Sequence, residues 1–302
     1  MPRSRLLVTL ALVLVGLASS RAASAFCRTT TCDKCTAVAG ACVTEGHPLF
    51  WPVTCINYDV QQRASTQADL DQVTAIADAA FETWASVTCP NGLPPSFTVR
   101  NLQPVACDKH EYNDQDKSFG GNANILIFRT GQWSEAQVTQ TLALTTVTFN
   151  VNSGEIYDAD IEVSDDNPIS VETPVLGGKY DLQSILTHEV GHFLGLAHSQ
   201  ACDAPDGRGC PTMDPVYRQG SDDFRSLEAD DVAGICTIYP ADRNATDNSC
   251  RPRHGFSSDC GSTGDSKGCC TTAPGGTSHG AVGALCASLL GLAAWVSRRR
   301  QT

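Results

Sequence analysis

Three of the seven histidines of this 302-residue chain lie within eleven positions, and their spacing limits how that stretch can fold. His188 and His192 are four residues apart, so on a helix their side chains lie on one face, about one turn apart. Gly195 lies three residues after His192, where a helix can end through a left-handed residue that glycine adopts without strain. The turn allows His198 to approach the other two imidazoles. The sequence therefore predicts a helix, a glycine turn and a returning segment.

This histidine cluster has two interpretations, a metal site or a buried helix rich in histidine. A single histidine on an apolar helix is usually a hydrogen-bonded core residue. The full pattern H-E-x-x-H-x-x-G-x-x-H, however, has a chance occurrence of roughly 10⁻⁵ at this composition, which favours the metal site. Three neutral imidazoles leave a fourth zinc position open, as in catalytic zinc sites. Glu189 projects to a neighbouring side of the helix, where it can act on a water without being a ligand.

The histidine pattern and a downstream methionine resemble the metzincin family of zinc proteases. Met213, in the stretch CPTMDPVY, is the only methionine besides Met1 and resembles the Met-turn beneath the metzincin histidines. The chain is similar to the matrixin branch, the matrix metalloproteases and their bacterial relatives, because Ser199 follows the third histidine and Pro215 lies two residues after Met213. Tyr217 is two residues too late to match the tyrosine ligand of astacin- and serralysin-type enzymes.

The resemblance implies an α/β domain at residues 48–241. Its expected fold is a mostly parallel five-stranded sheet with one antiparallel edge strand, three helices, and zinc in the cleft. The implied activity is that of a zinc endopeptidase. Its site residues are the zinc ligands His188, His192 and His198, the general base Glu189, and the supporting residues Gly195, Met213 and Pro215.

Two features depart from the matrixin pattern. His198 and Met213 are 15 positions apart, more than in matrixins, and we expect Cys202 and Cys210 to close a small loop in the excess, beside the primed side of the cleft. In addition, no propeptide with a cysteine switch is visible. Latency would then come from the cysteine-rich segment 26–47, through a zinc-ligating cysteine or by another route.

Hydrophobic periodicity predicts the order of the elements. Strands are expected at 51–60, 96–102, 124–130, 142–151 and 155–163, and the turn NSG joins the last two. Helices are expected at 65–87, capped by Ser65 or Thr66, at 181–194, and at 226–239.

Three acids in the last strand are candidate calcium ligands. Asp158, Asp160 and Glu162 alternate along the strand and offer the hard oxygen atoms that calcium prefers. The alternative is that they are solvated charges at a strand edge. The four histidines outside the motif are scattered, so we do not expect the structural zinc of the matrixins.

The start of the chain predicts export. Arg3 and Arg5 precede an apolar run, and small residues before Phe26 predict signal-peptide cleavage between Ala25 and Phe26. Exported chains meet an oxidising compartment, so most of the 15 cysteines are expected in disulfides. We prefer a disulfide to zinc for the CxxC in segment 26–47.

The end of the chain predicts an anchor. Residues 280–296 are apolar or small, at the lower limit for crossing a bilayer, and an arginine cluster follows. With Cys269 and Cys270 upstream, this arrangement resembles the C-terminal sorting signals of myxobacterial surface proteins. We therefore expect a bacterial protein that is secreted or anchored at the cell surface or outer membrane. An uncleaved single-span anchor is the alternative.

These observations divide the chain into five parts. They are a signal peptide at 1–25, a cysteine-rich segment at 26–47, the catalytic domain at 48–241, a flexible Ser/Gly/Cys linker at 242–279 with a Cys250–Cys260 disulfide, and an anchor at 280–302.

The expected partner is a protein or peptide substrate. It would lie extended along the antiparallel edge strand, at 142–149, as an added strand. A net charge of −12 without a basic patch argues against nucleic acid as a partner, and we expect a monomer. The alternative function is a non-catalytic, zinc-stabilised surface module for adhesion. The intact Glu189 argues against it.

Overall fold

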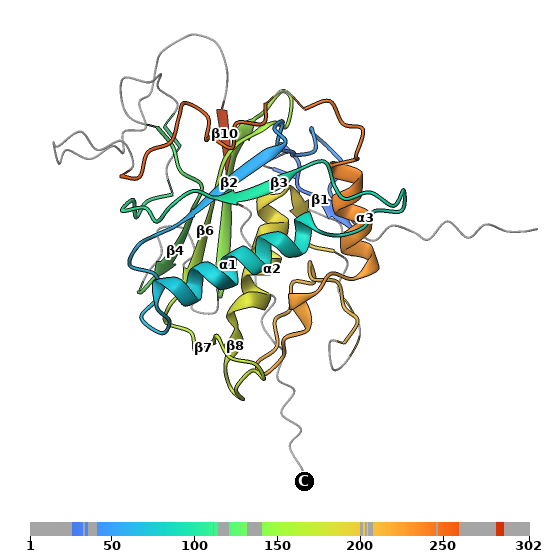
Figure 1. Cartoon of the computed structure of the whole chain (residues 1–302). Helices are drawn as coiled ribbons and strands as arrows, with labels where there is room; N and C mark the ends of the chain where they lie inside the picture. The colour runs from blue at the N-terminus through green and yellow to red at the C-terminus, as the bar shows by residue number, and fades with distance from the viewer. Residues whose placement is uncertain are drawn as a thin grey trace, which may run out of the picture.

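A mixed β-sheet forms the centre of the molecule, and helices α1 (Leu70–Ala85) and α2 (Leu182–Phe193) pack together on one of its faces (Figure 1). Helix α3 (Ala229–Ile238) lies at the side of this pair. The computed structural model describes residues 26–32, 34–35, 41–110, 112–113, 121–131, 141–199, 202, 204, 208–245, 247–259 and 282–286.

Five strands form the sheet that the sequence predicts, in the order β5, β6, β4, β2, β3. Neighbours in this set are parallel except β5 and β6, which form an antiparallel hairpin at one edge. A sixth strand, β10, pairs with β5 on its outer side. The predicted mostly parallel five-stranded sheet is confirmed, with β10 added to it. The strands are β2 (Cys55–Val60), β3 (Thr98–Asn101), β4 (Ile125–Arg129), β5 (Ala143–Asn150), β6 (Ile156–Ser164) and β10 (Val282–Cys286).

Helix α1 starts later than the sequence predicts. Its N-cap is Asp69, whose side chain accepts a hydrogen bond from the Gln72 backbone, and the Gln72 side chain caps Asp69 in return. The predicted caps were wrong because both residues bind Asp165 before the helix begins. The Ser65 hydroxyl donates to Asp165 Oδ1 at 2.5 Å, and the Thr66 backbone N–H donates to its Oδ2 at 2.7 Å.

Aromatic packing connects the sheet to both helices. The Phe81 ring of α1 stacks on Tyr58 of β2 with centroids 3.8 Å apart, and it packs edge-on against Phe193 of α2 at 5.2 Å. Trp84 Nε1 donates to the Thr187 carbonyl oxygen at 2.7 Å. The hydrophobic core therefore positions α2, the helix that carries the histidine motif.

The N-terminal cysteine-rich segment is built into the fold. Strand β1 (Cys27–Arg28) pairs with β9 (Leu196–Ala197), the short strand immediately before His198. Disulfides Cys27–Cys42 and Cys32–Cys35 close this segment, in agreement with the preference for a disulfide at the CxxC.

The packed chain also continues beyond residue 241. Cys250 forms a disulfide with Cys55 of β2, so the predicted Cys250–Cys260 pair was wrong. The reason is that the chain folds back over the sheet face opposite α1 and α2, where the Arg253 guanidinium lies 3.9 Å from the centroid of the Tyr157 ring. Part of the expected flexible linker therefore covers the sheet.

Little of the predicted anchor is described. Residues 282–286 form strand β10 within the range 280–302. Among the described residues, no helix has the length and apolar character needed to cross a bilayer. The signal peptide, Cys260, Cys269, Cys270 and the rest of the expected anchor lie outside the described residues.

Candidate metal centre and catalytic residues

Helix α2 carries His188, Glu189 and His192 into the interior. Its N-cap residue, Asp181, accepts a hydrogen bond from the first turn and forms an ion pair with Arg225 at 2.6 Å. His188 and Glu189 are completely buried, at 0% exposure, and His192 is buried as well. Packing on all sides therefore determines the direction of these side chains.

Gly195 ends this part of the chain in the left-handed conformation expected from the sequence. Its φ is +98°, and its N–H donates to the His192 carbonyl oxygen at 2.9 Å. A Cβ atom at this position would lie 2.6 Å from the Leu49 carbonyl oxygen. Both the backbone conformation and the close approach require glycine. Strand β9 follows and returns His198 toward α2.

Substituting Gly195 by alanine should therefore destabilise the fold and displace His198. We expect a loss of about 2–4 kcal/mol in the free energy of unfolding, measured by denaturant titration. Gly92→Ala is the matched control, because Gly92 has a φ of +79° but a Cβ there meets nothing within 4 Å. This control should cost only about 1 kcal/mol. Equal losses in the two variants would contradict the role of the Leu49 contact.

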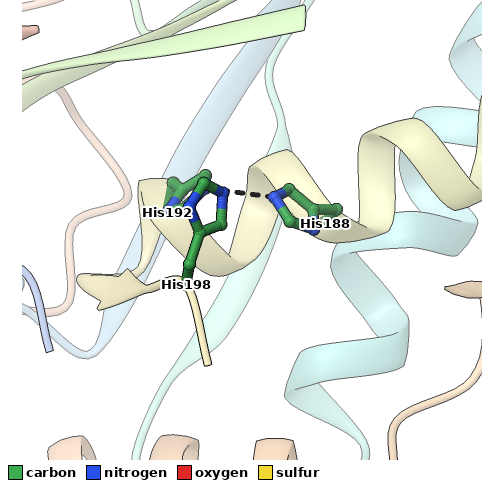
Figure 2. A group of neighbouring side chains, drawn as sticks. All are labelled: His188, His192 and His198. Atoms are coloured by element: carbon green, nitrogen blue, oxygen red, sulfur yellow. Dashed lines mark hydrogen bonds between the residues drawn. The ribbon is translucent and has the colours of Figure 1, made fainter. Parts of the chain in front are cut away.

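The three imidazoles meet at their Nε2 atoms (Figure 2). His192 Nε2 lies 3.1 Å from His188 Nε2 and 3.2 Å from His198 Nε2. On the far side of the rings, His188 Nδ1 lies 2.6 Å from the Thr212 carbonyl oxygen, and His192 Nδ1 lies 2.9 Å from that of Leu196. Carbonyl oxygens only accept hydrogen bonds, so these two rings carry their N–H at Nδ1. Their Nε2 atoms therefore keep a lone pair that can bind a metal ion.

This arrangement fits zinc. Burial lowers the pKa of each imidazole, that of His192 to about 4, and the neighbouring imidazoles lower the pKa values of His188 and His198 further. Neutral imidazole is the form that binds a metal. Lone pairs that face one another at these distances repel, and a cation between them removes the repulsion. Three nitrogen donors are a typical ligand set of catalytic zinc.

Glu189 has a hydroxyl donor on each oxygen of its carboxylate. Thr145 Oγ1 of β5 donates to Oε2 at 2.7 Å, and the Tyr217 hydroxyl donates to Oε1 at 3.3 Å. Burial raises the pKa of Glu189 to about 7, against the lowering effect of these two hydrogen bonds. The Tyr217 ring also lies 5.1 Å from the His188 ring. Neither Thr145 nor Tyr217 was assigned a role from the sequence.

Removing the Thr145 hydroxyl should impair the orientation of Glu189 without unfolding the protein. Thr145→Val keeps the shape of the side chain, and we expect kcat for peptide cleavage to fall about tenfold with little change in KM. Thr145→Ser keeps the hydroxyl and should stay within about twofold of the parent. Zinc content, measured by atomic absorption, should be the same in both variants. A similar kcat in the valine and serine variants would show that the hydrogen bond has no role in the reaction.

The Met-turn connects α2 to α3. Met213 is buried against α2, where a Cβ on Gly191 would lie 2.2 Å from its Sδ atom. Asp231 of α3 accepts hydrogen bonds from the backbone N–H groups of Thr212 at 2.7 Å and Met213 at 3.1 Å. Since the Thr212 carbonyl oxygen lies 2.6 Å from His188 Nδ1, Asp231 orients the His188 ring through the turn. The sequence reasoning did not identify this role of Asp231.

The expected loop disulfide is present between Cys202 and Cys210. Their Sγ atoms and an Asp214 carboxylate oxygen lie within 4.8 Å of one another. Both thiols are consumed by the disulfide, so this group is not a metal site. Pro215 is half-buried and leads the chain from the Met-turn toward Tyr217.

The three candidate calcium ligands do not form one cluster. Asp158, Asp160 and Glu162 alternate with core residues of β6, so they face the side of the sheet away from α2. Glu162 Oε1 lies 2.5 Å from Arg129 Nε, and Glu162 Oε2 lies 3.3 Å from His110 Nδ1. Asp158 and Asp160 are both buried, and their carboxyl groups influence one another electrostatically. Calcium at the two aspartates stays a prediction.

Burial gives this aspartate pair a pH signature. It raises the pKa of Asp158 to about 7 and that of Asp160 as well, and the negative charge of Asp158 raises the pKa of Asp160 further. The unfolded chain releases the Asp158 proton near pH 4 and the folded chain only near pH 7, and the pKa of Asp160 is shifted in the same direction. The contribution of this pair to stability is therefore fully present below about pH 4 and is lost as the pH rises through about 7.

Asp158→Asn should flatten that fall, changing the pH dependence of the free energy of unfolding by on the order of 1–3 kcal/mol. Denaturant titrations of parent and variant from pH 4 to 8 measure the difference. Repeating the series with calcium tests the metal prediction, because calcium bound to the ionised pair should restore stability near pH 7.5 in the parent only. Parallel pH profiles of the two proteins would show that the buried Asp158 carboxyl does not cause this pH dependence.

A small pocket opens beside Tyr217, the residue whose hydroxyl donates to Glu189. It lies between the start of α2 and the chain around the short helix η2 (Asp223–Arg225). Its lining comprises Tyr180, Asp181, Ser184, Tyr217, Arg218, Ser221, Asp223 and Phe224.

Comparisons with known proteins agree with this geometry. A profile of the Matrixin family matches residues 50–240. "Metalloendoproteinase 2-MMP" of Arabidopsis thaliana is 28% identical over 183 residues, 58% of this chain and 39% of that protein. "Putative matrix metalloproteinase" of Spodoptera frugiperda ascovirus 1a is 27% identical over 215 residues, 70% of this chain and 47% of that protein.

Another relative has a higher sequence identity over a shorter stretch. "Matrix metalloproteinase-19" of Mus musculus is 46% identical over 59 residues, 20% of this chain and 10% of that protein. The chain spans less than half the length of each of these relatives. The family match nevertheless covers well over half of this chain, including all three histidines, Glu189 and Met213. The chain belongs to the matrixin family of metalloproteases.

Proposed function

We propose that this protein is a zinc-dependent endopeptidase in which His188, His192 and His198 hold the metal and Glu189 is the general base. The observation that carries the proposal is the convergence of three Nε2 atoms at 3.1–3.2 Å beside a buried carboxylate. The intact carboxylate distinguishes this site from one that only stabilises a fold.

The chemistry follows from the environment of Glu189. His188, His192 and His198 would hold a zinc ion, which when bound would supply a Lewis acid for the peptide carbonyl and for the attacking water. Glu189 accepts a proton from the attacking water and delivers it to the leaving amine. The hydrogen bond from Tyr217 to Glu189 Oε1 is 3.3 Å long, and the one from Thr145 to Oε2 is 2.7 Å long. Because the longer bond is the weaker one, Oε1 is the oxygen that can more readily accept this proton.

The substrate would be an extended peptide. Strand β5 runs beside α2 and contributes Thr145 to the site, so a peptide that pairs with its outer edge passes Glu189. Main-chain pairing grips the backbone and leaves alternate side chains to be selected by pockets. The small pocket between Tyr217 and Phe224 would be the candidate to accept a short one of these side chains.

The test is cleavage of a quenched-fluorescent peptide library by the purified full chain. We expect cleavage within peptides, loss of activity with a zinc chelator, and a consensus that reports the side chains accepted. If the protein binds zinc but cleaves no peptide in the library, the alternative function, a non-catalytic adhesion module, would be favoured.

We also propose that the protein is exported, cut after Ala25 and either secreted, with residues 282–286 paired to the sheet, or held at the bacterial cell surface by its C-terminal segment. The Phe26 backbone nitrogen donates to Asp230 Oδ1 at 2.9 Å, so cleavage there would turn a hydrogen bond into an ion pair. Intact-mass measurement of protein from the culture medium and from the membrane fraction identifies both ends. A mature protein that begins elsewhere would contradict the cleavage site.

A further inference from the structure

The outer edge of β5 is occupied by the chain's own C-terminal segment. Strand β10 pairs with β5 in antiparallel register, from Val282 opposite Asn150 to Cys286 opposite Thr146. Figure 1 shows β10 in red. In the strand order of the sheet it stands next to β5, on the side away from β6. The strand expected to present a free edge to substrate is therefore already paired along more than half of its length.

The paired stretch reaches the catalytic residues. Cys286 is opposite Thr146, and the next residue of β5 is Thr145, whose hydroxyl donates to Glu189 at 2.7 Å. A substrate strand that passed Glu189 along this edge would need the same backbone N–H and C=O groups of β5 that β10 uses. Only one strand can pair with that edge at a time.

The sequence of the segment suits this position. Residues 282–286 read VGALC, with no charged residue and no proline to interrupt the ladder. Because the segment belongs to the same chain as β5, pairing is intramolecular, and its effective concentration at this edge is in the millimolar range.

We propose that residues 282–286 act as an intramolecular competitor that covers the substrate edge of β5. The proposal rests on the proposed function, in that peptides bind along this edge. The tethered strand reduces the fraction of molecules whose edge is open, so it raises the apparent KM and leaves kcat unchanged, because the open molecules react normally.

Proline in the segment tests this in the full chain. Gly283→Pro combined with Ala284→Pro removes two consecutive N–H groups, one of which points toward β5 in any antiparallel ladder. We expect the apparent KM for a fluorogenic peptide to fall about fivefold at unchanged kcat. Thr277→Pro is the control, because it places proline outside the paired register of residues 282–286. A synthetic peptide of residues 280–288 should inhibit the double variant competitively.

A second measurement separates this proposal from the proposed function. Hydrogen exchange of the amides in 146–150 should be faster in the double variant than in the parent, whether or not either protein cleaves peptides. Faster exchange without any peptidase activity would contradict the proposed function and leave the occupied edge intact. Equal exchange and equal KM in the two proteins would overturn the competitor. The parent protein could also remove residues 282–286 from itself, while the Glu189→Gln variant kept them. That result would overturn the competitor proposal, because the segment would be a substrate.

Discussion

Glu189→Gln is expected to lower kcat/KM for peptide cleavage about 10³-fold, the range associated with loss of a general acid–base group. Glutamine is nearly isosteric and can still accept the Thr145 hydrogen bond through its carbonyl oxygen, so the packing of α2 should persist. It cannot take up the proton of the attacking water. Steady-state kinetics on the best library peptide measure the effect, and zinc content should stay at the parental value.

Glu189→Asp is the companion variant. It keeps the carboxylate but withdraws it by one methylene, so that its reach to the water is shortened and the Thr145 bond is strained. We expect a smaller loss, about 10²-fold. If the glutamine variant retained a tenth or more of the parental activity, Glu189 would not be the general base.

Removal of zinc should have an equally large effect. Dialysis against a chelator is expected to bring peptide cleavage to the background rate, and one equivalent of zinc should restore it. The apo-protein should also melt at a lower temperature, because zinc binds the folded site and not the dispersed histidines of the unfolded chain. Differential scanning calorimetry with and without zinc measures this shift.

A substitution gives the same test without a chelator. His192→Ala should abolish zinc binding, since His192 Nε2 lies within 3.2 Å of both other Nε2 atoms. His47→Ala is the control, because His47 is exposed and lies outside the group of histidines that could hold the metal. Full activity of the apo-protein, or of the His192 variant, would exclude a zinc-dependent reaction.

The parts of this site that could be predicted are those encoded by local spacing. The interval of four between His188 and His192 requires only a helix, and Gly195 requires only a left-handed turn that any residue with a Cβ atom resists. The β5–β6 hairpin likewise depends on two neighbouring runs and a short turn between them. Each signal lies within a few residues of sequence, so no long-range contact was needed to interpret it.

The residues that were missed depend on contacts between distant segments. Thr145 meets Glu189 across 44 positions, and Tyr217 meets it across 28. A threonine in a buried strand and a tyrosine after a turn have many ordinary explanations, so nothing in their local sequence indicated a catalytic neighbour. The Cys55–Cys250 disulfide, with a separation of 195, illustrates the same limit.

Strand β1 determines when the site can form. It pairs with β9, immediately before His198, through contacts such as Thr29 Oγ1 to the Leu196 carbonyl oxygen, 167 residues apart. Contacts between such distant parts of the chain form late in folding, because a long loop must close first. The Cys27–Cys42 disulfide that closes the β1 segment forms only in an oxidising compartment. Under the proposed export, a chain still in the reducing cytosol would lack this disulfide, so the metal site would become complete only after the chain has left the cytosol.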